Sequence, residues 1–219
     1  MRKESLAMLA AVATLLLGGC PSFWNSPVTA EKPSTPDEMF KEAEEKFQNK
    51  DYSRAVELYE RIRATNPPDF KKIPEVNLKI AEALFNQGSY DAATARYYQF
   101  LELYPNHKEV PRARYQIAMT HFKQIKGLDL DIRALKQAAE SFKRLIDDPN
   151  AGEWLSKAEE KYNECQIKLA ERALYEADTN KRSGRYGAAR MAAQRVVDEF
   201  PKTPQAQEAK DFLKSIKGK

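Results

Sequence analysis

Residues 81–105, AEALFNQGSYDAATARYYQFLELYP, contain the pattern that decides the fold. Ala81 and Ala93 stand twelve residues apart, and Pro105 follows Ala93 by a further twelve. An alanine lets two helices pass close together, and a proline marks the end of a helical segment. The stretch therefore predicts two helices that cross at their alanines.

The same spacing recurs along the chain, which indicates an internal repeat. It returns at two further sets of positions: Ala43, Ala55 and Pro67, and Ala177, Ala189 and Pro201. A stretched copy lies between them, with twenty residues from Ala118 to Ala138 and the extra residues around 126–129. These are the distances of the tetratricopeptide (TPR) repeat, whose helix pairs bury their faces only against neighbouring pairs.

The rest of the chain agrees with a helical fold. The prolines beyond Pro36 fall between segments with apolar residues at three-and-four spacing, and no segment alternates with period two. We predict an all-α, TPR-type solenoid of about four and a half helix-turn-helix repeats, or roughly nine helices. The repeats cover 37–70, 74–106, 109–150 and 153–203, and a capping helix covers 204–217. One long helix is expected from about 153 to 183.

The composition argues against catalysis and against nucleic-acid binding. None of the segments has the clustered glycines of a phosphate-binding loop, and two Cys and two His are too few for a zinc site. The net charge is only +4, with basic and acidic residues interleaved. We therefore expect no cofactor, no metal ion, no catalytic residue and no nucleic-acid partner, and we do not expect an enzyme.

The N-terminus is typical of an exported, lipid-anchored protein. A basic start precedes an apolar run from Leu6 to Leu17, which has the length of a signal-peptide core. The run ends in Leu17-Gly18-Gly19-Cys20, which resembles the bacterial lipobox. That resemblance implies a signal peptide over 1–19, with lipid attached to Cys20. The alternative is an ordinary secretory signal that happens to contain a cysteine.

The residues after Cys20 predict how the chain is placed. Residues 20–36 are rich in proline and have little to pack, which is typical of a tether. Pro21 stands where the sorting rule for enterobacterial lipoproteins would require Asp for retention at the inner membrane. The expected location is therefore the periplasmic side of the outer membrane. Cys165 lies on an apolar helical stripe, where a buried residue is favoured over a reactive thiol.

The first helix of each TPR pair lines a groove that can bind a peptide. Counted from the repeat alanines, the candidate groove residues are Phe40, Glu44, Phe47, Leu78, Glu82, Phe85, Tyr115, Met119 and Phe122. Their aromatic character suggests an apolar or aromatic peptide. The alternative is a core position between repeats, which we favour for the last aromatic residue of each helix. We favour the groove for Phe40, Leu78 and Tyr115.

The fourth repeat has charged residues where the first three have aromatic ones. The candidate partner-docking residues are Asp178, Lys181, Arg182, Arg185, Arg190 and Arg195. Charges of this kind set the orientation and the association rate of a folded partner more than its affinity. The alternative is that they are solvated helix faces.

The order of these features resembles the BamD family of outer-membrane protein assembly lipoproteins. The similarity covers about Asp37 to Lys214 and is most specific in three stretches: residues 104–115, residues 122–131 and residues 169–203. It implies a periplasmic scaffold that binds a BamA-like subunit, other assembly lipoproteins and unfolded outer-membrane protein segments. The chain departs from the family at residues 178–180 and 191–192, and it lacks a complete fifth repeat, so docking at the C-terminal end is open.

A second interpretation is a periplasmic TPR lipoprotein of envelope maintenance, of the Tol-Pal-associated type. That family usually has a trimerising coiled coil before its repeats, whereas only the tether precedes Asp37 here. The widened third repeat is also not expected there. The BamD-like interpretation is therefore favoured.

Overall fold

The computed structural model describes residues 35–127 and 132–218, which form nine helices and no strand. The helices are α1 (Pro36–Gln48), α2 (Tyr52–Thr65), α3 (Ile73–Gln87), α4 (Tyr90–Leu103), α5 (Val110–Lys123), α6 (Arg133–Ile146), α7 (Trp154–Arg182), α8 (Tyr186–Glu199) and α9 (Pro204–Ser215). The predicted all-helical fold is confirmed. The predicted signal peptide, Cys20 and nearly all of the tether lie outside the described residues.

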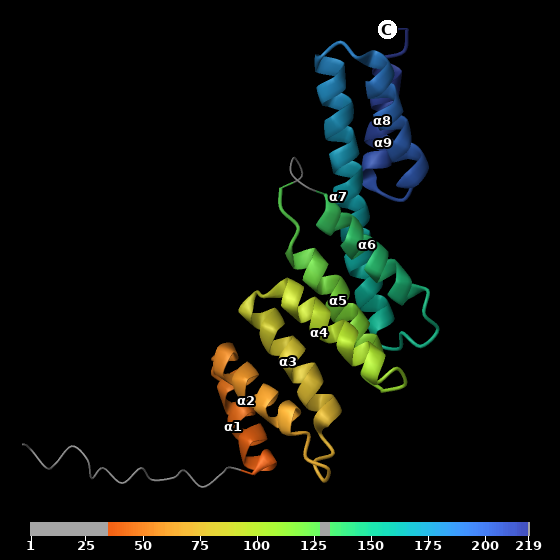
Figure 1. Cartoon of the computed structure of the whole chain (residues 1–219). Helices are drawn as coiled ribbons and strands as arrows, with labels where there is room; N and C mark the ends of the chain where they lie inside the picture. Colours follow the sequence, from red (N-terminus) through yellow and green to blue (C-terminus); the bar gives the residue numbers. More distant parts are fainter. Residues whose placement is uncertain (1–34, 128–131, 219) are drawn as a thin grey trace, which may run out of the picture. The chain divides into compact units, whose positions relative to one another are not determined.

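The helices pack in the order in which they follow one another along the chain. Each contacts the next, from α1 on α2 to α8 on α9, and α7 also contacts α5 and α9 (Figure 1). The pairs α1–α2, α3–α4, α5–α6 and α7–α8 are helix-turn-helix units, as in a TPR-like solenoid. Helix α9 follows as a cap, with Ala206 and Ala209 buried. Phe212 and Leu213 pack against buried residues of α7 and α8.

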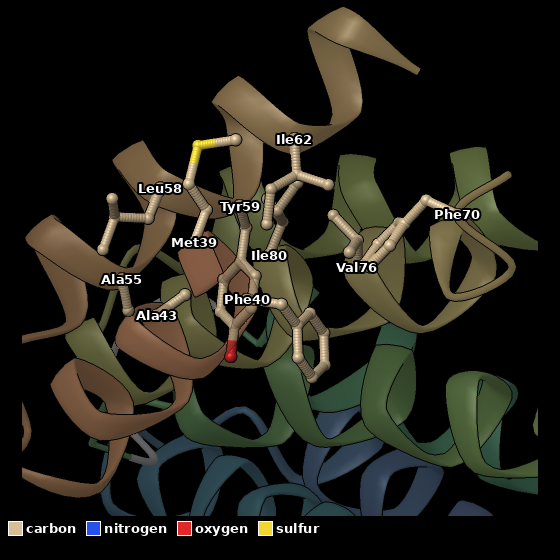
Figure 2. Packing of buried hydrophobic residues seen from close by; sticks show 10 residues of the cluster. All are labelled: Met39, Phe40, Ala43, Ala55, Leu58, Tyr59, Ile62, Phe70, Val76 and Ile80. Atoms are coloured by element: carbon tan, nitrogen blue, oxygen red, sulfur yellow. The ribbon is translucent and has the colours of Figure 1, made fainter. Parts of the chain in front are cut away.

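The repeat alanines lie in the cores of these pairs. No exposed surface remains on Ala43, Ala55, Ala81, Ala93, Ala118, Ala138, Ala177 and Ala189. Figure 2 shows Ala43 and Ala55 in the first cluster, together with Leu58, Tyr59 and other buried side chains of α1–α3. A small residue at each position is what allows the helices to approach one another.

Local signals explain where the helices begin and end. At α1, the Thr35 side chain accepts a hydrogen bond from the Glu38 backbone N–H, while the Glu38 carboxylate accepts one from the Thr35 N–H. This reciprocal pair is a capping box. Gly88 ends α3 with φ +86°, a left-handed conformation that favours glycine and turns the chain into α4.

The third pair differs from the others in its connection. Residues 124–132 separate α5 from α6, whereas 49–51, 88–89 and 183–185 separate the helices of the other three pairs. The extra residues predicted near 126–129 thus fall between two helices and leave the pairing intact. Residues 128–131 of this connection lie outside the described residues.

Helix α7 is shared between two parts of the solenoid. Its 29 residues extend over about 44 Å at 1.5 Å per residue, close to the predicted bounds. In its first half, Ala158 and Cys165 join the core of α5 and α6. In its second half, Ala173 and Ala177 join cores with α8 and α9. Cys165 is fully buried, as predicted, and burial raises the pKa of its thiol to about 12.

Candidate binding surfaces

The candidate groove residues lie on α1, α3 and α5, but three of them, Phe40, Leu78 and Glu82, are buried. Phe40 is 8% exposed and Leu78 is 4% exposed, although the sequence favoured the groove for both. The turn after α2 accounts for Phe40, because it places Phe70 against the Phe40 ring at a centroid distance of 6.0 Å. Tyr59 contacts the same ring edge-on at 5.8 Å (Figure 2). Phe40 is therefore enclosed by aromatic neighbours from α2 and from the turn that follows it.

In α1 and α3 the last aromatic residue is more accessible than the first candidate residue, whereas in α5 Tyr115 and Phe122 are both partly buried. Phe47, Phe85 and Phe122, for which the sequence favoured the core, pack against the core clusters while remaining partly exposed. Phe47 packs edge-on against Tyr52, and Phe85 packs in the same way against Tyr90, each at 5.5 Å between centroids. These rings thus flank the turns between paired helices and keep part of their surface outside the core.

In the third pair the candidate residues belong to an aromatic cluster. The Tyr115 ring lies 5.0 Å from the Trp154 ring and 5.7 Å from the Phe142 ring. The Phe122 ring lies 6.2 Å from the same Phe142 ring. Met119 is partly buried in the same core. This part of the candidate groove therefore joins α5 to α6 and to the start of α7.

Lysine side chains cover three of the candidate rings. The Lys72 ammonium lies 4.7 Å from the Phe40 centroid, and the Lys79 ammonium lies 5.0 Å from the Phe47 centroid. A third contact, of 5.5 Å, joins Lys161 to the ring of Phe122. Each lysine comes from the next repeat or the turn before it, and cations at these distances are attracted to the ring face. The repeat pattern did not predict these lysines, because it does not show which side chain crosses to the preceding helix.

The two candidate glutamates occupy equivalent repeat positions, and each pairs with a cation from the first helix of the next repeat. Glu44 of α1 accepts a hydrogen bond from the Tyr59 hydroxyl of α2, and its carboxylate lies 2.9 Å from Lys79 of α3. Glu82 of α3 pairs in a similar way with Arg112 of α5 at 2.6 Å. Each carboxylate thus joins its own helix to the first helix of the next repeat.

The second junction is more deeply buried. Glu82 is 8% exposed, and burial raises the pKa of its carboxyl group, against the opposing effect of the Arg112 guanidinium. Within residues 35–127 and 132–218, the buried Tyr97 hydroxyl has no hydrogen-bond partner. In the third repeat, Met119 stands at the Glu82 position and Phe142 at the Tyr97 position, so both polar members are absent together.

The candidate docking residues gather on the second half of α7 and on α8. Arg182 pairs with Asp178 along α7 at 2.6 Å, and Arg195 of α8 pairs with Glu176 of α7 at 2.6 Å. Lys181 lies over the Phe212 ring of α9 at 5.1 Å. Arg185 and Arg190 are exposed. The structure thus places all six on neighbouring elements, and Asp178, Lys181, Arg182 and Arg195 make contacts along or between helices.

An exposed methionine extends this charged surface. Met191 is 76% exposed and lines an open depression of about 880 Å³ together with Glu176, Arg190 and Arg195. The sequence indicated Met191 only as a departure from the family pattern. Methionine and arginine are both enriched at protein interfaces, which makes this depression a candidate docking surface.

The described residues give no support to a metal site or to a membrane-spanning helix. Within 35–127 and 132–218, no group of three or more His, Cys, Asp and Glu side chains could hold a metal ion. His121 is half-buried, and burial lowers its pKa. In the same residues, none of the helices combines the length and the apolar character needed to cross a bilayer.

Comparison with known proteins identifies the family. Residues 32–217 match the model of the YfiO family, described as outer membrane lipoprotein. The outer membrane protein assembly factor BamD of Neisseria meningitidis serogroup A is 22% identical over 187 residues, which cover 81% of this chain and 70% of that protein. BamD of Neisseria gonorrhoeae gives the same identity and coverage. A solved structure from Bacteroides ovatus covers 84% of this chain and 98% of its own, with 18% identity and a TM-score of 0.31. The chain therefore belongs to the BamD-type family of outer membrane lipoproteins, whose role is outer-membrane protein assembly.

Proposed function

We propose that this protein is a non-catalytic scaffold of the β-barrel assembly machinery, anchored by lipid on the periplasmic side of the outer membrane. In this proposal the α7–α8 end docks a folded, BamA-like subunit. The row formed by α1, α3 and α5 receives unfolded segments of outer-membrane proteins. The observation that carries the proposal is the contrast between these two surfaces in one chain of the BamD-type family.

The α7–α8 surface has the chemistry of a docking site for a folded partner. Arg190 and Arg195 flank Met191 on α8, so charge surrounds an exposed apolar side chain. Arginine and methionine are enriched at protein interfaces, and rim charges steer the partner into register. The ion pair between Arg195 and Glu176 holds one of these arginines in a defined position.

The α1–α3–α5 row is suited to extended segments. Its partly exposed rings, Phe47, Phe85 and Phe122, recur once per repeat, and a long cationic side chain covers two of them. Regularly spaced contacts of this kind fit an extended chain better than a compact domain. The row thus supports the second half of the proposal.

Charge reversal on α8 tests the docking surface. We expect the double variant Arg190→Glu and Arg195→Glu to bind the periplasmic domains of the BamA-like subunit about tenfold more weakly, because reversed rim charges repel the partner. The loss should shrink as the salt concentration rises. Binding is measured by surface plasmon resonance on the full chain in detergent, with circular dichroism to check the helices.

The matched control is Arg61→Glu on α2, an exposed arginine far along the chain from α8. It should leave binding unchanged. Equal weakening by the control, or full binding by the α8 variant, would place the docking surface elsewhere. Recovery of Tol or Pal components in place of a barrel-assembly subunit from solubilised envelope would favour the envelope-maintenance alternative.

The proposed anchor makes a separate prediction at Cys20. Mass spectrometry of the protein isolated from membranes should show Cys20 as the first residue, with lipid on its sulfur and its amino group. Cys20→Ala should leave the chain uncleaved or released from the membrane, since two or more acyl chains are needed for stable anchoring. An unmodified N-terminus at any other residue would contradict the lipid anchor.

A further inference from the structure

A basic pocket lies between the N-terminal ends of α3 and α5. Its volume is about 320 Å³, and apolar contributions come from Pro74 and Leu78. Five cationic side chains line it: Lys71, Lys72, Lys79, Lys108 and Arg112. Three carboxylates also line it: Glu75, Glu82 and Glu109. The lining thus has more cationic than anionic side chains.

The most deeply buried carboxylate of the pocket, that of Glu82, already has a cationic partner. Glu82 pairs with Arg112 at 2.6 Å, and only 10% of its side chain is exposed. Among the described residues, by contrast, no ion pair engages Lys71 or Lys108, and both are exposed at the rim. These two ammonium groups are thus available to an incoming anion.

The helix ends add to the positive potential. Helices α3 and α5 begin at the pocket, and neither N-cap residue, Lys72 or Glu109, accepts a side-chain hydrogen bond from the first turn. The N-terminus of a helix has a partial positive charge and N–H groups that lack partners within the helix. Together with the lysines, these ends favour a negatively charged group.

The pocket is linked to the candidate groove by two of its lysines. Lys72 lies over the Phe40 ring, and Lys79 lies over the Phe47 ring while its ammonium group also pairs with Glu44. A ligand carboxylate that draws Lys79 away would uncover Phe47 for an apolar side chain of the ligand. The Lys79 and Glu44 side chains are 20% and 30% exposed, so solvent reaches this pair and a ligand carboxylate can compete with Glu44 for the ammonium group.

We propose that this pocket binds a carboxylate of an extended peptide segment, so that the row selects segments in which acidic and aromatic residues are close together. The carboxylate is either an acidic side chain or the C-terminus of the segment. The three acidic residues of the lining favour a singly charged carboxylate over a doubly charged phosphate. This inference rests on the proposed role of the α1–α3–α5 row and defines the chemistry of its ligand.

Short labelled peptides test this inference on the full chain in detergent. One peptide is Gly-Glu-Phe-Glu-Tyr-Gly with an amidated C-terminus, and its partner has Gln in place of both Glu. A second pair compares Gly-Gln-Phe-Gln-Tyr-Phe as the free acid and as the amide. Binding is measured by fluorescence anisotropy. If the pocket binds acidic side chains, the Glu peptide should bind about tenfold more tightly than the Gln peptide, and if it binds a C-terminus, the free acid should bind about tenfold more tightly than the amide. Raising the salt from about 50 mM to about 300 mM should reduce the difference.

Two lysine variants assign the effect to the pocket. Lys71→Ser combined with Lys108→Ser should weaken the binding of the carboxylate peptides about fivefold, because two exposed cations are lost. The binding of the neutral peptides should stay unchanged. The control pair, Lys136→Ser with Lys210→Ser, removes two exposed lysines of α6 and α9 and should have no effect.

Three outcomes would overturn the inference. The first is equal binding of acid and neutral peptides, which would leave the proposed row intact but remove its charge selection. The second is stronger competition by inorganic phosphate than by acetate at equal concentration, which would indicate a phosphate site. The third is that none of the peptides binds. In that case a separate measurement of binding to the BamA-like partner would show whether the proposed scaffold role still holds.

Discussion

Replacing Arg112 by alanine is expected to lower the free energy of unfolding by about 2 to 4 kcal/mol at neutral pH, since it leaves the buried Glu82 carboxylate without its cation. The loss should be smaller at acid pH. Burial raises the pKa of Glu82, so the folded state binds a proton more readily than the unfolded state. As the pH falls through the pKa of the folded state, Glu82 becomes neutral and no longer needs Arg112. Urea denaturation at two pH values measures both effects.

The chain itself supplies the control for this prediction. Met119 and Phe142 stand in the third repeat where Glu82 and Tyr97 stand in the second. The triple variant Glu82→Met, Tyr97→Phe and Arg112→Met copies that apolar arrangement and should unfold within about 1 kcal/mol of the wild type. An Arg112→Ala variant as stable as the wild type at both pH values would contradict the assignment of Glu82 as a buried, paired carboxylate.

Enlarging a repeat alanine is the second change with a large expected effect. Ala55→Leu, Ala93→Leu and Ala189→Leu should each lower the free energy of unfolding by about 1 to 3 kcal/mol, because these methyl groups are fully buried where paired helices meet and a larger side chain overpacks the core. Thermal or urea unfolding measures the loss.

Neighbouring alanines provide the comparison for these variants. Ala92 precedes Ala93 and Ala188 precedes Ala189, yet both are exposed. Ala92→Leu and Ala188→Leu should therefore change the free energy of unfolding by less than about 0.5 kcal/mol. Equal losses at buried and exposed alanines would mean that the packing of the repeat has been assigned to the wrong helix face.

The contacts within each helix pair could be predicted from the sequence because they depend on spacing. Ala43 and Ala55, or Ala81 and Ala93, must meet if two helices are joined by a short turn. The long α7 could be predicted in the same way, since its apolar residues continue at helical spacing as far as Gly184. That glycine has a left-handed φ of +71°. Regular spacing thus carries the fold.

The contacts between one repeat and the next were harder to predict because they depend on turns and on flexible side chains. Burial of Phe40 requires Phe70, which lies in an irregular turn with no repeat counterpart to indicate it. Lys79 has several rotatable bonds, and only the folded arrangement shows that it reaches both Phe47 and Glu44. The aromatic groove predicted from spacing is consequently covered in part by positive charge.

The docking residues could be placed on one end of the chain by their sequence positions alone. Their individual contacts could not be predicted in this way, because they join different helices. Arg195 of α8 pairs with Glu176 of α7, and Lys181 of α7 lies over the Phe212 ring of α9. Met191 was not recognised as a surface residue, since an isolated methionine within a helix is as compatible with the core as with an interface. Its exposure required the packing of α8.

The length of α7 also affects how the molecule loses its structure. In a regular solenoid each repeat contacts only its neighbours, so the ends can open while the middle stays folded. Here one continuous helix contributes Cys165 to the core of α5 and α6 and Ala177 to the core of α8 and α9. Melting either core breaks the helix that supports the other. Residues from α5 to α9 should therefore unfold as one cooperative unit, with amide protons of α7 among the last to exchange with solvent.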